Sequence, residues 1–408
     1  MMKRDCSTTL DRILGQGALQ TYFQPLVSIK TRSIIGVEAL ARGVTNDRLR
    51  SPEQLFHQAA REGCTLALDR LCREHALASF ASLPCPAGTL LFLNFDTEII
   101  DQGIVGSDFL LQQVQHHGLP TQQVVIEIME SKVRDVAALR RFVESYRDYG
   151  FLIALDDIGT GHSNLDRIPM LKPDILKIDR SLIQQIDQEY YQQVVFKSLV
   201  NMAKDLGVLV VAEGIETEGE AVTTLQLGAD LLQGFYFAYP HAPPCADVPE
   251  THRRIAQIAA RYRDHMIDHV RTIKSRHQYY DTLLTAIVQE LARVHDGRYD
   301  GVLRELITRY PALECVYVLD SAGMQISETV AHAAAIPRQG TPIFRPARPG
   351  TDHSLKEYFY LLVNTSIEKF TTDPYISLAS GERCITISAI FYDGAGALRV
   401  LCVDVNPE

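Results

Sequence analysis

Short apolar runs recur between residues 33 and 237, and each ends on a polar side chain that can do chemistry. The residues that end these runs are, in chain order, Glu38, Asn94, Glu127, Asp156, Lys177, Glu213 and Gln233. Most of these side chains offer oxygen atoms, which are the ligands that hard divalent cations such as Mg2+ and Mn2+ prefer. Unpaired carboxylates that are packed together repel one another, so such a cluster needs a metal ion or a proton. The pattern therefore predicts a divalent-metal site.

The number of acids also indicates what such a site would do. Asp157 stands beside Asp156, so the set holds more ligands than one ion needs. Two ions about 3.5 to 4 Å apart, sharing Asp156, would polarise a phosphodiester and lower the pKa of a bridging water for in-line attack. Lys177 would hold that water or stabilise charge on the phosphorus. A lysine at a strand end is more often a salt-bridge partner, but inside a cluster of acids we favour the catalytic role.

The runs themselves predict the elements that position these residues. Short continuous apolar runs are typical of buried parallel strands. They recur at roughly 30-residue intervals, the length of a strand-plus-helix unit, and the stretches between them carry helix signals such as Ser51-Pro52-Glu53-Gln54. Seven or eight such units close into a (β/α)8 barrel, in which the carboxyl ends of the strands converge on one open face. The sequence therefore predicts an α/β fold, a TIM-like barrel with the polar residues on that face.

The periodicity changes after the proline-rich segment 239–244. Apolar residues spaced mostly by three, four or seven between residues 252 and 294 predict one long amphipathic helix, or two. A separate small α+β unit follows. Its expected elements are a helix near Val302–Ile307, a strand over Cys315–Leu319, and a hairpin of the strands Cys384–Phe391 and Ala397–Val403. We therefore expect a barrel at 1–245, a helical linker at 246–297 and an α+β domain at 298–408.

Composition and charge exclude several classes of protein. The chain has 408 residues, of which 46% are hydrophobic and 22% charged, as in ordinary globular proteins. A formal net charge of −10 argues against binding of duplex nucleic acid. No apolar run approaches the ~18 residues of a membrane span, and no signal peptide is recognisable. Eight scattered cysteines without a C-x-x-C pair favour reduced, buried thiols. We expect a cytoplasmic protein.

Five motifs resemble those of a known family. They are Glu38-Ala39-Leu40-Ala41-Arg42, Asp156-Asp157-Ile158-Gly159-Thr160-Gly161, Lys177-Ile178-Asp179, Ala212-Glu213-Gly214-Ile215-Glu216 and Gln233-Gly234-Phe235-Tyr236-Phe237. With these motifs in the family's order, residues 10–245 resemble the EAL-domain cyclic di-GMP phosphodiesterases. The resemblance implies hydrolysis of cyclic di-GMP to linear pGpG with two Mg2+ or Mn2+ ions per barrel. A second class stays open, a catalytically weak or inactive receptor that signals nucleotide occupancy.

The resemblance also implies roles for individual residues. The first metal ion would be bound by Glu38, Asn94, Glu127 and Asp156, and the second by Asp157 and Glu213. Lys177 would position the attacking water, and the catalytic set would be Lys177, Asp157 and Glu213. The residues implied to contact the dinucleotide are Gln24, Leu40, Arg42, Asp179, Glu216, Gln233 and Pro240. Glu130 would anchor the loop after Asp157 rather than bind metal.

Four positions depart from the residues common in the family, and none is an implied metal ligand. Ile158 stands where Phe is common, His162 where Tyr is, Asn164 where Ser is, and Tyr239 where Arg is. In this family the loop that holds Ile158 and His162 couples metal binding to the dimer interface. We therefore expect the departures to affect rate and regulation more than chemistry.

The C-terminal unit resembles the PAS or Cache-like sensor modules found in signalling enzymes. It would bind an unknown small ligand, or it would be a dimerising module without one. Candidate pocket residues are Arg345, Arg348, Asp352, Lys356, Tyr358, Tyr375 and Ser377. A homodimer is expected, because the loop after Asp157 abuts a dimer interface in this family and a lone helix would expose the apolar stripe from Ile255 to Val294. The C-terminal unit would regulate the barrel through that helix.

Overall fold

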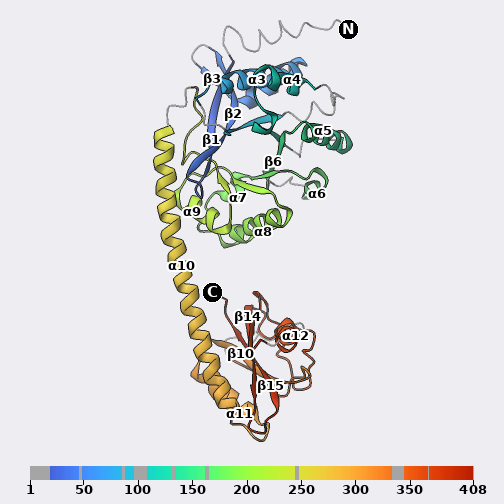
Figure 1. The fold of residues 1–408 in the computed structure, drawn as a ribbon, viewed down its shortest axis with the longest axis vertical. Coiled ribbons are helices and arrows are strands. Elements are labelled where there is room, and N and C mark those ends of the chain that lie inside the picture. The colour runs from blue at the N-terminus through green and yellow to red at the C-terminus, as the bar shows by residue number, and fades with distance from the viewer. Residues whose placement is uncertain are drawn as a thin grey trace. The chain divides into compact units, whose positions relative to one another are not determined.

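The structure is a computed structural model of the chain (Figure 1). It describes residues 19–45, 48–84, 88–95, 108–129, 135–160, 165–243, 248–332, 344–365 and 367–407. The chain forms two compact units, Met1–Ile267 and Asp268–Glu408. Each unit has its own apolar core.

The first unit is a closed barrel with helices around it. Its strands are β1 (Leu19–Ser28), β2 (Ser33–Thr45), β3 (Arg48–Arg50), β4 (Leu90–Phe95), β5 (Val124–Met129), β6 (Leu152–Ile158), β7 (Ile175–Ile178), β8 (Leu209–Ala212) and β9 (Leu231–Leu232). The ring of described strands runs β1-β9-β8-β7-β6-β5-β4-β2 and closes by the pairing of β2 with β1, while β3 pairs with β2 outside the ring. The predicted eight-stranded α/β barrel is therefore confirmed.

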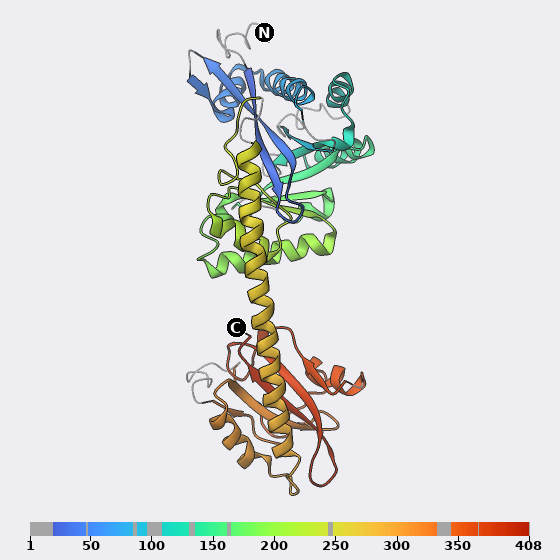
Figure 2. The ribbon, with the colours of Figure 1, turned by 60° about the vertical axis from the view of Figure 1, so that its left-hand side comes forward.

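β1 is the barrel strand that the apolar runs did not predict. It pairs antiparallel with both β2 and β9, whereas the other neighbours in the ring pair in parallel. A short turn joins it to β2 in place of a helix, and the two strands form a long antiparallel pair, drawn in blue in Figure 2. Because β1 is not part of a strand-plus-helix unit, it lies outside the repeat that indicated the other seven strands.

Helices cover the outside of the barrel. They are α2 (Pro52–Glu62), α3 (Thr65–Ala81), α4 (Phe109–His116), α5 (Val136–Asp148), α6 (Arg167–Leu171), α7 (Arg180–Ile183), α8 (Tyr190–Leu206) and α9 (Glu218–Leu227), with a short 3-10 helix, η2 (Thr121–Gln123). The helix signal at Ser51 is confirmed, because Ser51 and Gln54 form a capping box with Pro52 in the first turn of α2. The main core lies between these helices and the strands.

The second unit is an antiparallel sheet with helices. It contains α11 (Tyr299–Arg309), α12 (Glu357–Asn364) and the strands β10 (Leu313–Asp320), β11 (Val330–Ala331), β12 (Lys369–Thr371), β13 (Tyr375–Ile376), β14 (Arg383–Tyr392) and β15 (Leu398–Val405). The strand order is β11-β10-β15-β14-β12, and β13 also pairs with β14. The expected late hairpin is confirmed, since Tyr392 pairs with Leu398 at its closed end.

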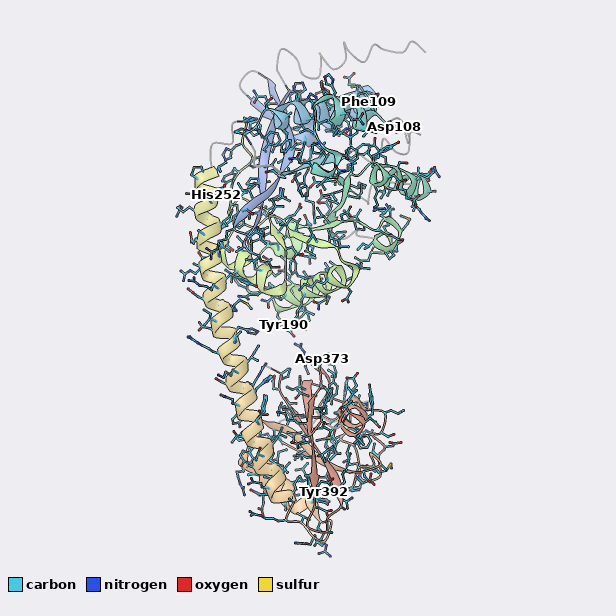
Figure 3. The ribbon with its side chains drawn as sticks, viewed as in Figure 1. Asp108, Phe109, Tyr190, His252, Asp373 and Tyr392 are labelled. Carbon is cyan, nitrogen blue, oxygen red and sulfur yellow. The ribbon has the colours of Figure 1, made fainter. Side chains whose placement is uncertain are left out.

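The long helix predicted after the barrel is one helix, α10 (Val248–Leu291). Figure 3 labels His252 in its first turns. Ile255 and Ile258 are buried in the core of the first unit, while Leu284 and Ile287 are buried in the core of the second. The expectation that a lone helix would expose the whole apolar stripe is therefore wrong, because this chain's own cores cover both ends. Among the described helices, none has the length and apolar character that crossing a membrane requires.

Candidate active site

One layer of apolar side chains fills the barrel interior. It consists of Leu26, Phe92, Val125, Ala154, Ile175, Val211 and Leu231, one from each of seven ring strands. Side chains alternate between the two faces of a strand, so the residue two positions along also points inwards. Towards the open face, counted backwards in the antiparallel β1, these residues are Gln24, Asn94, Glu127, Asp156, Lys177, Glu213 and Gln233. The strand period thus places the predicted site residues directly above the apolar layer.

β2 supplies the eighth inward-facing residue, Glu38. Two positions before it lies Gly36, where an added Cβ atom would come within 2.7 Å of the Phe92 ring. Phe92 therefore fills the place that a β2 side chain would take in the apolar layer. The prediction that Glu38 ends its strand is wrong, because β2 continues to Thr45 by pairing with β1 and then β3.

Glu38 is the centre of the hydrogen-bond network at the site, and it is buried. Its Oε1 accepts from Asn94 Nδ2 at 2.7 Å, and its Oε2 accepts from Gln233 Nε2 at 2.7 Å. Gln233 Nε2 also donates to Gln24 Oε1 at 3.2 Å, and Gln24 in turn donates to the main-chain carbonyl of Ala238. These contacts bring together four residues that the sequence analysis assigned to metal or nucleotide binding.

Lys177 lies among the carboxylates and is only 1% exposed. Its Nζ is 2.5 Å from Glu127 Oε1 and 2.6 Å from Glu213 Oε1. It is 3.5 Å from one oxygen each of Glu38 and Asp156. The alternative reading of Lys177, a salt-bridge partner, therefore describes its contacts in this structure.

The charges at the site shift one another's pKa values. Burial raises the pKa of Glu127 well above its ordinary value, and the charge of Glu38 raises it further. Burial also raises the pKa of Glu213 well above its ordinary value and raises that of Asp156, although the Lys177 ammonium opposes both shifts. Burial therefore disfavours the charged form of Glu127, Glu213 and Asp156.

Glu38 and Lys177 shift in the opposite sense. Burial would raise the pKa of Glu38, but the charge of Lys177 and hydrogen bonds from Gln233 and Asn94 together lower it. Burial would lower the pKa of Lys177, but the surrounding carboxylates, Asp156 foremost, hold it well above its ordinary value. The ammonium group therefore stays charged at neutral pH, and it faces four acidic side chains.

The donor set suits a divalent cation in its chemistry. Both carboxylate oxygens of Glu127 are buried, and so is Oε1 of Glu213; the Lys177 ammonium is the cation next to Oε1 of each residue. One lysine faces four acids, so a divalent cation could balance the carboxylates that ionise beyond the single charge of Lys177. Among the described residues, no three acidic, His or Cys side chains are arranged to hold a metal ion as they stand. An ion bound here would therefore take over contacts that Lys177 now makes.

The backbone is irregular at the Asp156–Asp157 step. The pairing register between β6 and β7 shifts between Leu155 and Ile158, and Asp157 has a φ of 58°, in the left-handed region. Asp156 Oδ1 accepts from the backbone N–H of Asp157 at 3.0 Å. Such irregularities often re-aim side chains beside active sites. Glu130, His162 and Asn164 lie outside the described residues.

A cavity of about 240 Å3 opens beside Glu38. Its walls include Gln24, Leu40, Glu213, Glu216 and Gln233, together with Arg180, Gly214, Gly234 and Phe235. Arg180 lies 3.0 Å from Glu216 in an ion pair and was not among the residues predicted from the sequence. The stacking of Phe235 on Tyr239, whose ring centres are 4.5 Å apart, was not predicted either.

A second, larger cavity of about 580 Å3 is also lined by Glu38 and Leu40, and by Asn94. A buried ion pair, Asp69 with Arg73, lines it, and the Arg73 guanidinium lies 4.6 Å from the centre of the Phe95 ring. Nothing in the sequence motifs indicated this pair. The sequence signal for this ion pair is that Asp69 and Arg73 stand four positions apart on a helix. Many helices have such a spacing without a functional role.

Three residues expected to contact the nucleotide line neither cavity. Arg42 donates to the carbonyl of Ala41 at 3.0 Å. Asp179 caps α7 by accepting from the backbone N–H of Ser181. Pro240 is half-buried and precedes His241. The structure therefore brings most, but not all, of the expected residues to one place.

In the candidate C-terminal pocket, Tyr358 and Ser377 are buried and Tyr375 is half-buried, whereas the other four candidates are exposed. Ser377 and Thr386 both donate to the buried carboxylate of Asp404, and Tyr375 bonds to Thr386. Burial raises the pKa of Asp404 to about 6. The exposed members are Arg345, Arg348, Asp352 and Lys356, so the seven candidates do not line one buried site.

Comparison with known proteins identifies the family. The family model of the EAL domain matches residues 7–240, so the chain belongs to the EAL domain family. The chain is also similar to the crystal structure of the Bacillus subtilis YkuI protein, with an EAL domain, in complex with substrate c-di-GMP and calcium. That likeness covers 98% of this chain and 99% of the other, at a TM-score of 0.79 and 25% identity.

Two further relatives match part of the chain. A manganese and cy-diGMP complex of Klebsiella pneumoniae BlrP1 covers 56% of this chain and 57% of that one, with a TM-score of 0.51 and 29% identity. The probable cyclic di-GMP phosphodiesterase PdeA of Escherichia coli is 28% identical over 243 residues, which are 59% of this chain and 32% of PdeA.

Proposed function

We propose that the barrel hydrolyses cyclic di-GMP to linear pGpG with the help of divalent metal ions. The observation that carries the proposal is the buried oxygen cluster around Glu38, which opens directly into a cavity. Support comes from membership of the EAL family and from likeness to YkuI, which was solved with substrate c-di-GMP and calcium. The name of PdeA supports the same reaction class.

Mg2+ or Mn2+ is the metal we propose, with two ions in each barrel. Glu38, Asn94, Glu127 and Asp156 would hold the first ion, and Asp157 and Glu213 the second. Such ions polarise a phosphodiester and activate water. Lys177 would release its contacts with the acids and orient the attacking water through its ammonium group. Gln24, Gln233 and Leu40 would line the nucleotide side of the cavity.

The test is a product assay on the full-length protein. Cyclic di-GMP is incubated with the protein in Mg2+, in Mn2+ and in a chelator, and the products are separated by chromatography. Linear pGpG should form with either metal ion and not with the chelator. Absence of pGpG under all three conditions would contradict the proposal.

A receptor is the second candidate function, and one observation favours it. Lys177 engages all four carboxylates, so the contacts an ion needs are already taken. A receptor would bind cyclic di-GMP without turnover and pass its occupancy to the C-terminal unit. Calorimetry with Ca2+, beside the product assay, separates the two candidates: binding without pGpG supports the receptor.

The organisation of the chain is also part of the proposal. We propose a catalytic barrel at 1–245, a linker at 246–297 that dimerises, and a sensor-like domain at 298–408 that regulates the barrel. The first turns of α10 pack in the barrel core, which gives the linker a direct hold on the catalytic unit. A small ligand of the C-terminal domain and a cytoplasmic location remain predictions from the sequence.

A further inference from the structure

The first turns of α10 hold the loop that follows Gln233. Arg254 Nη1 donates to the main-chain carbonyl of Phe235 at 3.3 Å and also to the carbonyl of Tyr236. The Arg254 guanidinium lies 5.7 Å from the centre of the Tyr236 ring. A charged donor with several N–H groups in one plane is well suited to fix two neighbouring carbonyl groups. Arg254 therefore links α10 to the main chain of this loop.

Other contacts fix α10 in the same place. Thr251, 2% exposed, donates to the carbonyl of Phe237 at 3.4 Å. Further along the same helix, Gln257 donates to Glu218 in the first turn of α9 at 2.7 Å. Ile258 is buried in the barrel core. The first turns of α10 are thus part of the barrel unit, and Arg254 acts from a fixed support.

The neighbouring arginine makes a different set of contacts. Arg253 and Arg254 both pair with Glu250, Arg254 through Nε at 2.9 Å. The Arg253 side chain is 67% exposed, and its described hydrogen bonds all go to Glu250. The Arg254 side chain is 34% exposed and reaches the loop. The chain therefore offers a matched pair of arginines, only one of which holds the loop.

The loop held by Arg254 is tied to the loop that follows Glu213. The backbone N–H of Ile215 donates to the Gln233 carbonyl at 3.0 Å, and that of Tyr236 donates to the Ile215 carbonyl at 2.9 Å. An added Cβ atom at Gly234 would come within 2.1 Å of the Ile215 main chain. The loops after Glu213 and Gln233 are therefore in close main-chain contact and must move together.

Gln233 links the position of this loop to the hydrogen-bond network of the site. It donates to Glu38 at 2.7 Å, and Phe235, two residues on, lines the 240 Å3 cavity. We propose that Arg254 is a positioning residue for the nucleotide site: by holding the Phe235 and Tyr236 carbonyls it fixes the side chain of Gln233 on Glu38 and the Phe235 wall of the cavity. This inference rests on the proposed function, because the nucleotide is its ligand.

The test compares Arg254→Ala, Arg254→Lys and Arg253→Ala in the full-length protein. Three quantities are measured: the Kd for cyclic di-GMP in Ca2+ by calorimetry, the kcat and KM in Mg2+, and amide hydrogen exchange over residues 234–238. Arg254→Ala should weaken nucleotide binding about tenfold, which corresponds to ~1.4 kcal/mol, and should speed exchange in the loop. Arg254→Lys keeps the charge but loses the planar fork, so it should fall between Arg254→Ala and wild type. Arg253→Ala should match the wild type.

Two outcomes would overturn the inference. One is an Arg254→Ala protein with wild-type Kd and wild-type loop exchange. The other is an equal effect of Arg253→Ala, which would assign the effect to Glu250 or to helix charge. If Arg254→Ala does not fold, Arg254→Lys decides, because unchanged binding and exchange in that variant would equally contradict the role.

The same experiments distinguish failure of the proposed function from failure of the role of Arg254. A wild-type protein that binds cyclic di-GMP without forming pGpG would contradict the enzyme, yet Kd and loop exchange would still decide the role of Arg254. A wild-type protein that does not bind the nucleotide at all would overturn both the proposed function and this inference.

Discussion

At the scale of single residues, the contacts of Lys177 distinguish the two candidate functions, enzyme and receptor. With its ammonium group among four carboxylates, the site is a salt-bridge cluster. If ions replace those contacts, the ammonium group of Lys177 becomes available for the water-orienting role that we propose for it. A buried charge released from its partners is costly unless new partners form, so metal binding and movement of Lys177 must be coupled.

Glu38→Ala should reduce hydrolysis by more than tenfold. Glu38 is an implied metal ligand and also accepts hydrogen bonds from Asn94 and Gln233. Its loss would therefore remove a metal ligand and break the hydrogen-bond network. The measurement is the rate of pGpG formation in Mg2+. Glu144→Ala is the control, because Glu144 is an exposed residue of α5 that pairs with Arg140. Turnover above about a tenth of wild type would mean a barrier change below ~1.4 kcal/mol and would contradict the assignment.

Glu127→Gln should stabilise the metal-free protein increasingly as pH rises. Folding raises the pKa of Glu127 well above its ordinary value of 4.5. Such a group favours the folded state below its unfolded pKa, and this contribution is lost as pH rises through the folded pKa. In a chelator, the two proteins should have similar Tm at pH 4, and the variant should have the higher Tm at pH 8.

Adding Mn2+ provides the control for this prediction. The ion should raise the Tm of the wild type at pH 8 and leave that of Glu127→Gln nearly unchanged, because the variant lacks a charged ligand. Parallel dependences of Tm on pH for the two proteins in chelator would contradict the burial argument.

At the scale of elements, the barrel interior depends on one position without a side chain. Gly36 in β2 leaves room for Phe92, and an added Cβ atom would come within 2.7 Å of the ring and 2.9 Å of the Leu90 carbonyl. Two residues further lies Glu38, so a distortion at Gly36 acts directly on the site. The packing of the apolar layer therefore determines the position and orientation of the acidic side chains next to it.

Gly36→Ala should destabilise the protein by about 1 to 3 kcal/mol through overpacking. The matched control is Gly301→Ala, since Gly301 lies in helix α11 with no atom within 4 Å of an added Cβ. This control should be neutral or stabilising by about 1 kcal/mol, because alanine favours helix over glycine. Denaturant unfolding measures both, and a Gly36→Ala protein as stable as wild type would contradict the layer model.

At the scale of the whole molecule, the proposed homodimer depends on the middle of α10. The ends of this helix are buried in the cores of the two units, whereas Ile267 and Val270 are 44% and 58% exposed. An apolar stripe left on a single helix is most simply covered by the same stripe of a second copy. The dimer contact is therefore expected there rather than along the entire helix.

Val270→Glu should convert the dimer to a monomer of 45.7 kDa in light scattering. Thr272→Glu adds the same charge on the opposite side of the helix and should leave the dimer intact. A wild-type protein that is already monomeric at micromolar concentration would contradict the dimer, and a Val270→Glu dimer would place the contact elsewhere.

The sequence by itself determined the barrel class and most of the site. Strand period and motif order depend on local residue types. The sequence alone therefore indicated the site residues Glu38, Asn94, Glu127, Asp156, Lys177, Glu213 and Gln233. Parallel strands put their carboxyl ends on one face of a barrel. This rule predicted that these residues lie close together.

Only the tertiary structure decided how these residues meet. The pairing of the reversed strand β1 and the contacts of Lys177 with four acids join segments that are distant in the chain. The contact of Arg254 with the loop that follows Gln233 distinguishes two neighbouring arginines of equal local character. Arg253 and Arg254 are indistinguishable as residue types, yet one faces solvent and the other the loop. Local pattern cannot assign such contacts, because they depend on the packing of α10 against the barrel.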